Sequence, residues 1–147
     1  MSNWVTITVD HLKAAGNGLI MDRAASMSIG GIDPVAEAIA GATARVCRAV
    51  QTGNALDIDP TKVPDSLKDI TKRLALFALM ERIQLPLSVD QRDTRNNDIS
   101  DLKRITDNRQ RVEKADNPNA EAEMQPTPSP AIAPRHRRFR YRDESCI

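Results

Sequence analysis

The residues best suited to binding chemistry lie near the C-terminus, where arginines alternate with aromatic side chains. Arg135–Arg142 reads RHRRFRYR. A guanidinium group pairs with phosphates and carboxylates through several fixed N–H donors, and an aromatic ring can stack on a base or fill a pocket. The pattern therefore predicts a segment that binds a partner. Its candidate residues are Arg135, Arg137, Arg138, Phe139, Arg140, Tyr141 and Arg142.

The sequence leaves three interpretations of Arg135–Arg142 open. In an extended strand, side chains alternate between the two sides, so Phe139 and Tyr141 would share one face and the neighbouring arginines the other. Such a strand could add to the edge of a partner's sheet, with main-chain hydrogen bonds contributing affinity. The segment could instead contact nucleic acid, or form a solvated basic terminus.

The other reactive residue types form no catalytic or metal-binding pattern. His11 and His136 accompany no Ser or Cys nucleophile motif. Cys47 and Cys146 lack the paired spacing of a zinc site, so we expect two free thiols. The acidic loop at residues 55–63 lacks the glycine and the distal glutamate of a calcium loop. We therefore expect no enzymatic activity, no cofactor and no metal.

Composition favours a small helical protein. The 147 residues suit one domain, and only 3% are aromatic, so the core must come from aliphatic side chains. The net charge is +1, but five arginines of Arg135–Arg142 leave −4 on the rest of the chain, which indicates a mildly acidic body with a basic tail. No signal-peptide pattern and no apolar run long enough to span a bilayer is present, so we expect no membrane association.

A central helix is predicted between Pro64 and Pro86, because neither proline fits a helix interior. Asp65 or Ser66 could cap its start. The run Leu74–Met80 reads LALFALM, and a helix that is apolar all round for about two turns is covered on several sides. The helix is therefore either a core helix or one shared with a neighbouring subunit. Candidate core or subunit-interface residues are Leu74, Leu76, Phe77 and Met80.

Three further helices are predicted on either side of this one. Thr8 is a suitable cap for a short helix over Val9–Ala15, which Gly16 would end. Asp33 followed by Pro34 starts an amphipathic helix to about Gln51, whose many small residues would let another helix approach closely. The last helix is expected from Asp98 or Ser100 to about Lys114, after a polar, loop-like stretch at residues 87–98.

Two N-terminal stretches are less determined by their sequence. Trp4–Val9 could form a short strand, but no pairing partner is evident. Leu19–Ile32 could contain a helical turn before Gly30 and Gly31 interrupt it. We therefore expect an all-α fold: a small four-helix bundle-like domain over residues 1–114. The remaining residues, 115–147, are rich in proline and arginine and predict an extended C-terminal arm that docks on a partner.

The order of these elements resembles the small all-helical head–tail connector (adaptor, or neck) proteins of tailed bacteriophages. The resemblance covers about Val5–Lys114 and depends on the order and spacing of elements more than on any one motif. The residues that carry it are Thr8–Lys13, Asp33-Pro34 with the Ala-rich helix to Val50, an acidic loop, Val63–Ile70, Ala75–Leu79 and a charged last helix.

The resemblance implies a structural protein of the virion, located at the head–tail junction after synthesis in the host cytoplasm. Such proteins form a ring, typically dodecameric, beneath the portal of the DNA-filled head. They extend the channel for genomic DNA, contact the next neck or tail protein, and can dock C-terminal segments on the portal. In this chain Arg135–Arg142 would be that anchor. A tail-completion protein is a variant of this hypothesis, and a small nucleic-acid-binding module with a basic tail is the alternative.

Overall fold

The computed structural model describes residues 3–28 and 30–118, which are mostly helical. The expected helical fold is confirmed in this coarser form. The four-helix bundle is not confirmed, because the described residues form a fifth helix and a small two-stranded sheet. In chain order the elements are β1 (Trp4–Thr6), α1 (Val9–Lys13), α2 (Gly18–Ser26), α3 (Pro34–Gln51), β2 (Lys62–Pro64), the 3-10 turn η1 (Asp65–Leu67), α4 (Lys68–Arg82) and α5 (Val89–Thr106).

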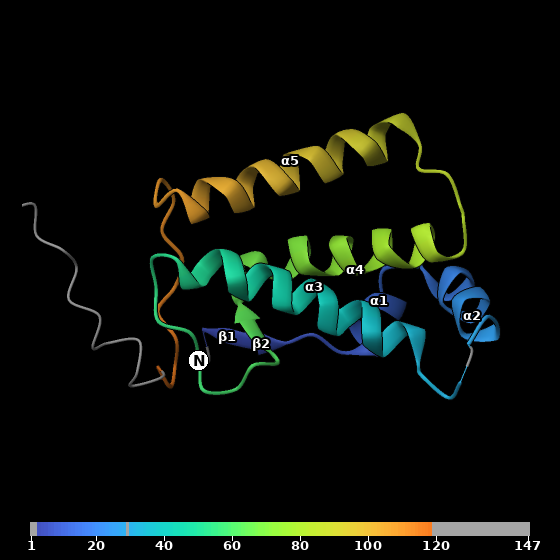
Figure 1. Ribbon diagram of the computed structural model, residues 1–147, viewed down its shortest axis with the longest axis horizontal. Coiled ribbons are helices and arrows are strands. Elements are labelled where there is room, and N and C mark those ends of the chain that lie inside the picture. Colours follow the sequence, from blue (N-terminus) through green and yellow to red (C-terminus); the bar gives the residue numbers. More distant parts are fainter. Residues whose placement is uncertain (1–2, 29, 119–147) are drawn as a thin grey trace, which may run out of the picture.

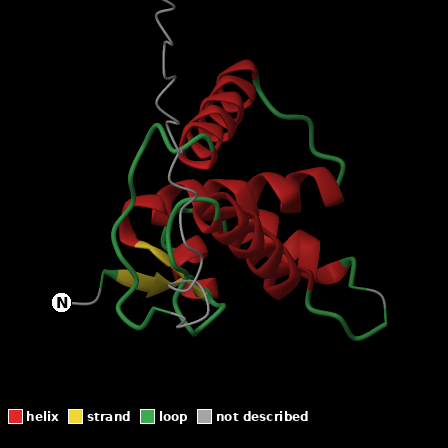
Figure 2. Cartoon of the chain, turned by 60° about the vertical axis from the view of Figure 1, so that its left-hand side comes forward, coloured by secondary structure: helices red, strands yellow, loops and turns green. Residues whose placement is uncertain are grey.

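The antiparallel helices α3 and α4 form the centre of the body, and the other elements lie around them (Figure 1). Helix α5 lies on one side of this pair, and α1, α2 and the sheet lie on the other (Figures 1 and 2). Helix α3 starts as the sequence predicts, because the Asp33 carboxylate accepts a hydrogen bond from the Val35 N–H at 2.9 Å. It also ends at Gln51, as predicted.

Helix α4 begins later than predicted. Residues Asp65–Leu67 form a 3-10 turn, and no side chain caps the start of the α-helix at Leu67. The expectation that Asp65 or Ser66 caps it is therefore wrong, and the Ser66 hydroxyl instead donates to the carboxylate of Glu113 at 2.6 Å. The helix ends at Arg82, and Gln84 adopts a left-handed conformation (φ 55°) before the chain turns toward α5.

Helix α5 starts and ends earlier than the sequence predicts, so both predicted bounds are wrong. The polar stretch expected to be a loop is its first half, which begins at Val89 through a reciprocal capping pair. The Ser88 hydroxyl accepts from the Gln91 N–H at 3.2 Å, and the Gln91 side chain accepts from the Ser88 N–H at 3.0 Å. The helix ends at Thr106 rather than near Lys114. Only the second half of α5 reaches the core, where Leu102 and Ile105 form a thin apolar stripe and Asp98 is also buried. Most of the other side chains of the helix are at least partly exposed.

Contacts with distant parts of the chain also determine the structure of the two N-terminal stretches. Helix α2 forms within the stretch the sequence left undecided, and buries Met21 and Ala24. The strand at the N-terminus has a partner after all. In the antiparallel pair Trp4 lies opposite Pro64 and Val5 lies opposite Val63, so β2 occupies the end of the predicted acidic loop.

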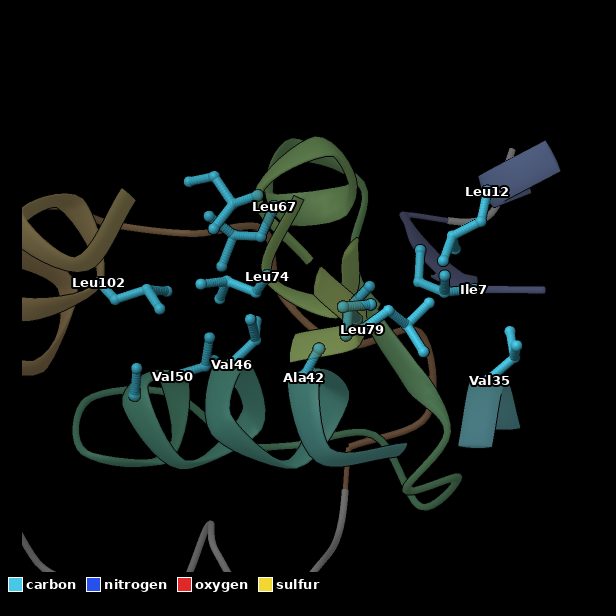
Figure 3. Packing of buried hydrophobic residues seen from close by; sticks show 14 of the residues in the cluster. Ile7, Leu12, Val35, Ala42, Val46, Val50, Leu67, Leu74, Leu79 and Leu102 are labelled. Carbon is cyan, nitrogen blue, oxygen red and sulfur yellow. The ribbon is translucent and has the colours of Figure 1, made fainter. Parts of the chain in front are cut away.

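The core is a single cluster between α3, α4, α5 and the N-terminal elements. In Figure 3, Val46 and Val50 of α3 point toward Leu74 of α4, and Leu102 of α5 approaches from the side. All four side chains are buried, and Val46 and Val50 are fully so. Burial of such aliphatic groups is the main favourable contribution to folding, and it fixes α3 against α4.

Candidate interaction surfaces

The predicted binding segment Arg135–Arg142 and Cys146 lie outside the described residues. The candidate core or interface residues of α4 lie within them. Leu74, Phe77 and Met80 are buried within the chain itself, whereas Leu76 is half-buried and lines a small hollow beside Leu12. Three of these four side chains are therefore covered within a single copy of the chain.

The final described residues fasten to the body and form a segment that we call the strap (residues 111–118). It follows α5 and descends along the body toward the sheet (orange in Figure 1). Val112 and Ala115 pack against the core cluster. The carbonyl oxygen of Glu113 accepts from the indole N–H of Trp4 at 3.3 Å, and Trp4 itself is 2% exposed.

The carboxylate of Asp116 completes the attachment of the strap to strand β1. It accepts hydrogen bonds from the N–H of Asn3 at 3.0 and 3.1 Å and from that of Trp4 at 3.2 Å. Just beyond the ends of the two strands, the Asn3 carbonyl accepts from the Asp65 N–H, and the alternating pattern of an antiparallel pair then directs the Trp4 N–H away from β2. Asp116 thus satisfies a backbone donor on the outer edge of the sheet.

A buried aspartate holds the other side of the strap. The Asp57 side chain is 1% exposed, and its two oxygens accept from the N–H groups of Asp59 (3.0 Å) and Asn117 (3.1 Å). The Ile58 N–H donates to the Asn117 carbonyl at 2.9 Å. Both carboxylate oxygens of Asp57 thus accept backbone hydrogen bonds that hold the loop and the strap in place. Within residues 3–28 and 30–118, no group of three or more His, Cys, Asp or Glu side chains could hold a metal ion.

An open groove of about 540 Å³ lies between α3 and α4 on the described surface. We call it the α3–α4 groove. Small residues leave room for it, because Ala38, Gly41 and Ala42 of α3 and Ala78 of α4 line the groove. Two larger side chains, Leu74 and Leu79, complete the apolar floor, and the charged rim consists of Glu37, Arg45, Glu81 and Arg82.

Ion pairs organise part of the rim of this groove. Arg82 pairs with Glu37 across the two helices at 2.6 Å, and Arg95 of α5 approaches Glu81 at 3.7 Å. Arg45 forms no ion pair within the described part of the chain. The run of small residues in α3 signalled close helix approach, but only the packing of α3 on α4 showed that this approach leaves an open groove.

A partly buried ion pair connects α4 to α5. Arg73 donates to the Asp98 carboxylate from Nε at 2.9 Å and from Nη2 at 2.6 Å. Asp98 is 3% exposed, and its hydrogen bond raises the pKa of Arg73 above the ordinary value. Burial raises the pKa of the Cys47 thiol, so this thiol is less reactive than an exposed one.

Several large apolar side chains stay exposed on the described surface. The most exposed are Leu19 (86%), in the first turn of α2, and Val89 (72%), the first residue of α5. Single exposed apolar residues are common on monomers, so each needs a complementary surface before it indicates an interface. None of the described helices is long and apolar enough to cross a membrane.

The chain matches no protein-family model, no curated protein and no solved structure.

Proposed function

We propose that the chain is a structural subunit of the neck of a tailed bacteriophage. It forms a ring between the portal of the head and the tail, and its C-terminal arm docks on the portal. The ring extends the channel through which genomic DNA passes. The helical body and the order of its elements support the proposal, as does the resemblance of residues 5–114 to head–tail connector proteins.

The observation that carries this proposal is the fastening of the strap. Trp4 and Asn3 donate hydrogen bonds to Glu113 and Asp116 of the strap. The Asn117 N–H of the strap in turn donates to the carboxylate of Asp57. Residues 119–147 therefore start from a fixed place on the body. An arm that carries a binding segment gains effective concentration when its origin is fixed relative to the partner.

Ring formation also suits the surface of the body. Small domains with few aromatic residues bury a modest share of their surface, so contact with neighbouring subunits adds to their stability. The α3–α4 groove and the exposed Leu19 are surfaces that such contacts could cover.

The test is the solution mass of the full-length protein, alone and mixed with candidate portal protein, measured by native mass spectrometry. We expect a defined high-order ring or a defined complex with portal. The double variant Phe139→Ala/Tyr141→Ala should weaken portal binding at least tenfold. A matched control is Met124→Ala/Ile132→Ala, which removes similar apolar bulk elsewhere in the arm and should leave binding unchanged. Equal binding by both variants would refute the anchor role.

The alternative is a nucleic-acid-binding module, which the five arginines of Arg135–Arg142 favour. Neutralisation of phosphates by arginine releases counterions, so binding would weaken steeply with salt. A monomer that ignores portal protein but binds DNA in this salt-dependent way would replace the neck proposal with this one.

A further inference from the structure

We propose that the α3–α4 groove receives the first turn of α2 from a second copy of this chain, with Leu19 as the inserted side chain. This inference rests on the proposed ring and states which surfaces of neighbouring subunits meet. It assigns a partner to this groove and to Leu19, the most exposed large apolar side chain among the described residues.

The groove has the shape and chemistry for a helix turn. Its volume of about 540 Å³ exceeds the space of one side chain, and its floor is made of aliphatic groups. Gly41 and Ala78 line it, and small residues allow the backbone of an incoming helix to approach closely. No residue of α2 lines the groove in its own chain, so an α2 that enters the groove would have to come from another molecule.

Helix α2 presents a matching surface. Leu19 is 86% exposed in its first turn, and Asp22 and Arg23 are exposed three and four positions later, on the same side of the helix. Asp22 forms no ion pair within the described residues, and neither does Arg45 on the groove rim. An incoming α2 could therefore place the Asp22 carboxylate beside Arg45 while Leu19 enters the apolar floor.

The inserted residue and the groove are different surfaces of one chain, which fixes the kind of assembly. A contact between unlike surfaces is head-to-tail, so each subunit offers one free α2 and one free groove to its neighbours. Such a contact repeats until it closes into a ring or extends into a filament. The pairing thus accounts for a closed ring without requiring a twofold axis between neighbours.

The first test compares Leu19→Glu and Ala78→Gln with a matched control, Val89→Glu, by native mass spectrometry of the full chain. Leu19 and Val89 are both exposed apolar residues in the first turn of a helix, where Glu is well tolerated. We expect the first two variants to associate at least tenfold more weakly than wild type, and the control to assemble normally. Circular dichroism should show the same helix content in all three.

The outcomes distinguish a failure of this contact proposal from a failure of the ring proposal. If wild type forms a ring and both Leu19→Glu and Ala78→Gln form it equally well, the contact is overturned while the ring stands. If the wild type assembles only on portal protein, the same comparison is made on that complex. A wild type that stays monomeric with and without portal overturns the ring, and this contact with it.

Disulfide trapping provides a second measurement that detects weak contacts. Two proteins are mixed under oxidising conditions in a Cys146→Ser background, one with Leu19→Cys and the other with Ala78→Cys. We expect a covalent dimer from this mixture, because the two sulfurs meet only when α2 of one chain enters the groove of another. Val89→Cys mixed with Ala78→Cys is the control. A yield no higher than this control would contradict the proposal.

Discussion

Replacing one partner of the Arg73–Asp98 pair should have a strongly unequal effect on stability, because only Asp98 is buried. The Asp98 side chain is 4% exposed, whereas that of Arg73 is 40% exposed. Arg73→Met leaves a carboxylate buried without its two donors. Asp98→Asn leaves a guanidinium group that can turn toward water. The exposed fractions therefore predict that loss of the arginine costs more stability than loss of the aspartate charge.

The magnitude follows from the burial of each partner. Breaking a fully buried pair costs about 3–5 kcal/mol. Because water reaches the half-exposed Arg73, we reduce this to about 2–3 kcal/mol for Arg73→Met. Asp98→Asn keeps an acceptor for one hydrogen bond and should cost about 1 kcal/mol. The pair joins α4 to α5, so the loss should appear as global destabilisation.

Urea unfolding followed by circular dichroism measures these differences as a shift of the midpoint at constant slope. Arg104→Met is the matched control, because Arg104 pairs with Asp101 at 3.3 Å on the same helix but both side chains are exposed. It should cost less than about 0.5 kcal/mol. An Arg73→Met protein as stable as the Arg104→Met protein would refute the reasoning, as would a larger loss from Asp98→Asn.

Three further changes test local features of the body. A Cβ at Gly53 would overlap the Asn108 side-chain oxygen, so Gly53→Ala should lower the free energy of unfolding in urea by about 1 kcal/mol. Asn108→Gly in the same chain should recover most of this loss, because it removes the obstructing amide and suits φ 56°. The hydrogen bond from Lys72 lowers the pKa of Asp69, so this carboxylate stabilises the fold above pH about 3.8 and loses its contribution as the pH falls through the lowered pKa. Lys72→Met should return the Asp69 pKa toward its ordinary value in an NMR titration, and an unchanged pKa would contradict that cause. Met80 is 3% exposed, so Met80→Gln would bury an amide group. It should lower the free energy of unfolding, measured by heat or urea, by about 2–3 kcal/mol. An unchanged stability would contradict this and mean that water reaches the site.

Short-range sequence signals predicted those features that depend on the hydrogen bonds of a single helical turn. Asp33 and Pro34 predicted the start of α3, because a cap and a preset φ act within the first turn. Gly16 adopts the expected left-handed conformation (φ 79°), although α1 ends at Lys13 rather than at the predicted Ala15. The capping pair at Ser88 was equally local and would have revealed the start of α5, but the polar composition of that stretch concealed it.

Tertiary structure decided the features that join distant parts of the chain. Trp4 and Asp116 are 112 residues apart in sequence, and no local pattern indicates that one carboxylate serves the free edge of β1. The pairing of β1 with β2, the attachment of the strap and the open groove beside α4 likewise depend on how α3 and α4 pack. Helix starts and turns are set by nearby hydrogen bonds, and the sequence by itself determined these. Strand partners and surfaces depend on which apolar faces bury each other, and only the assembled core fixes that choice.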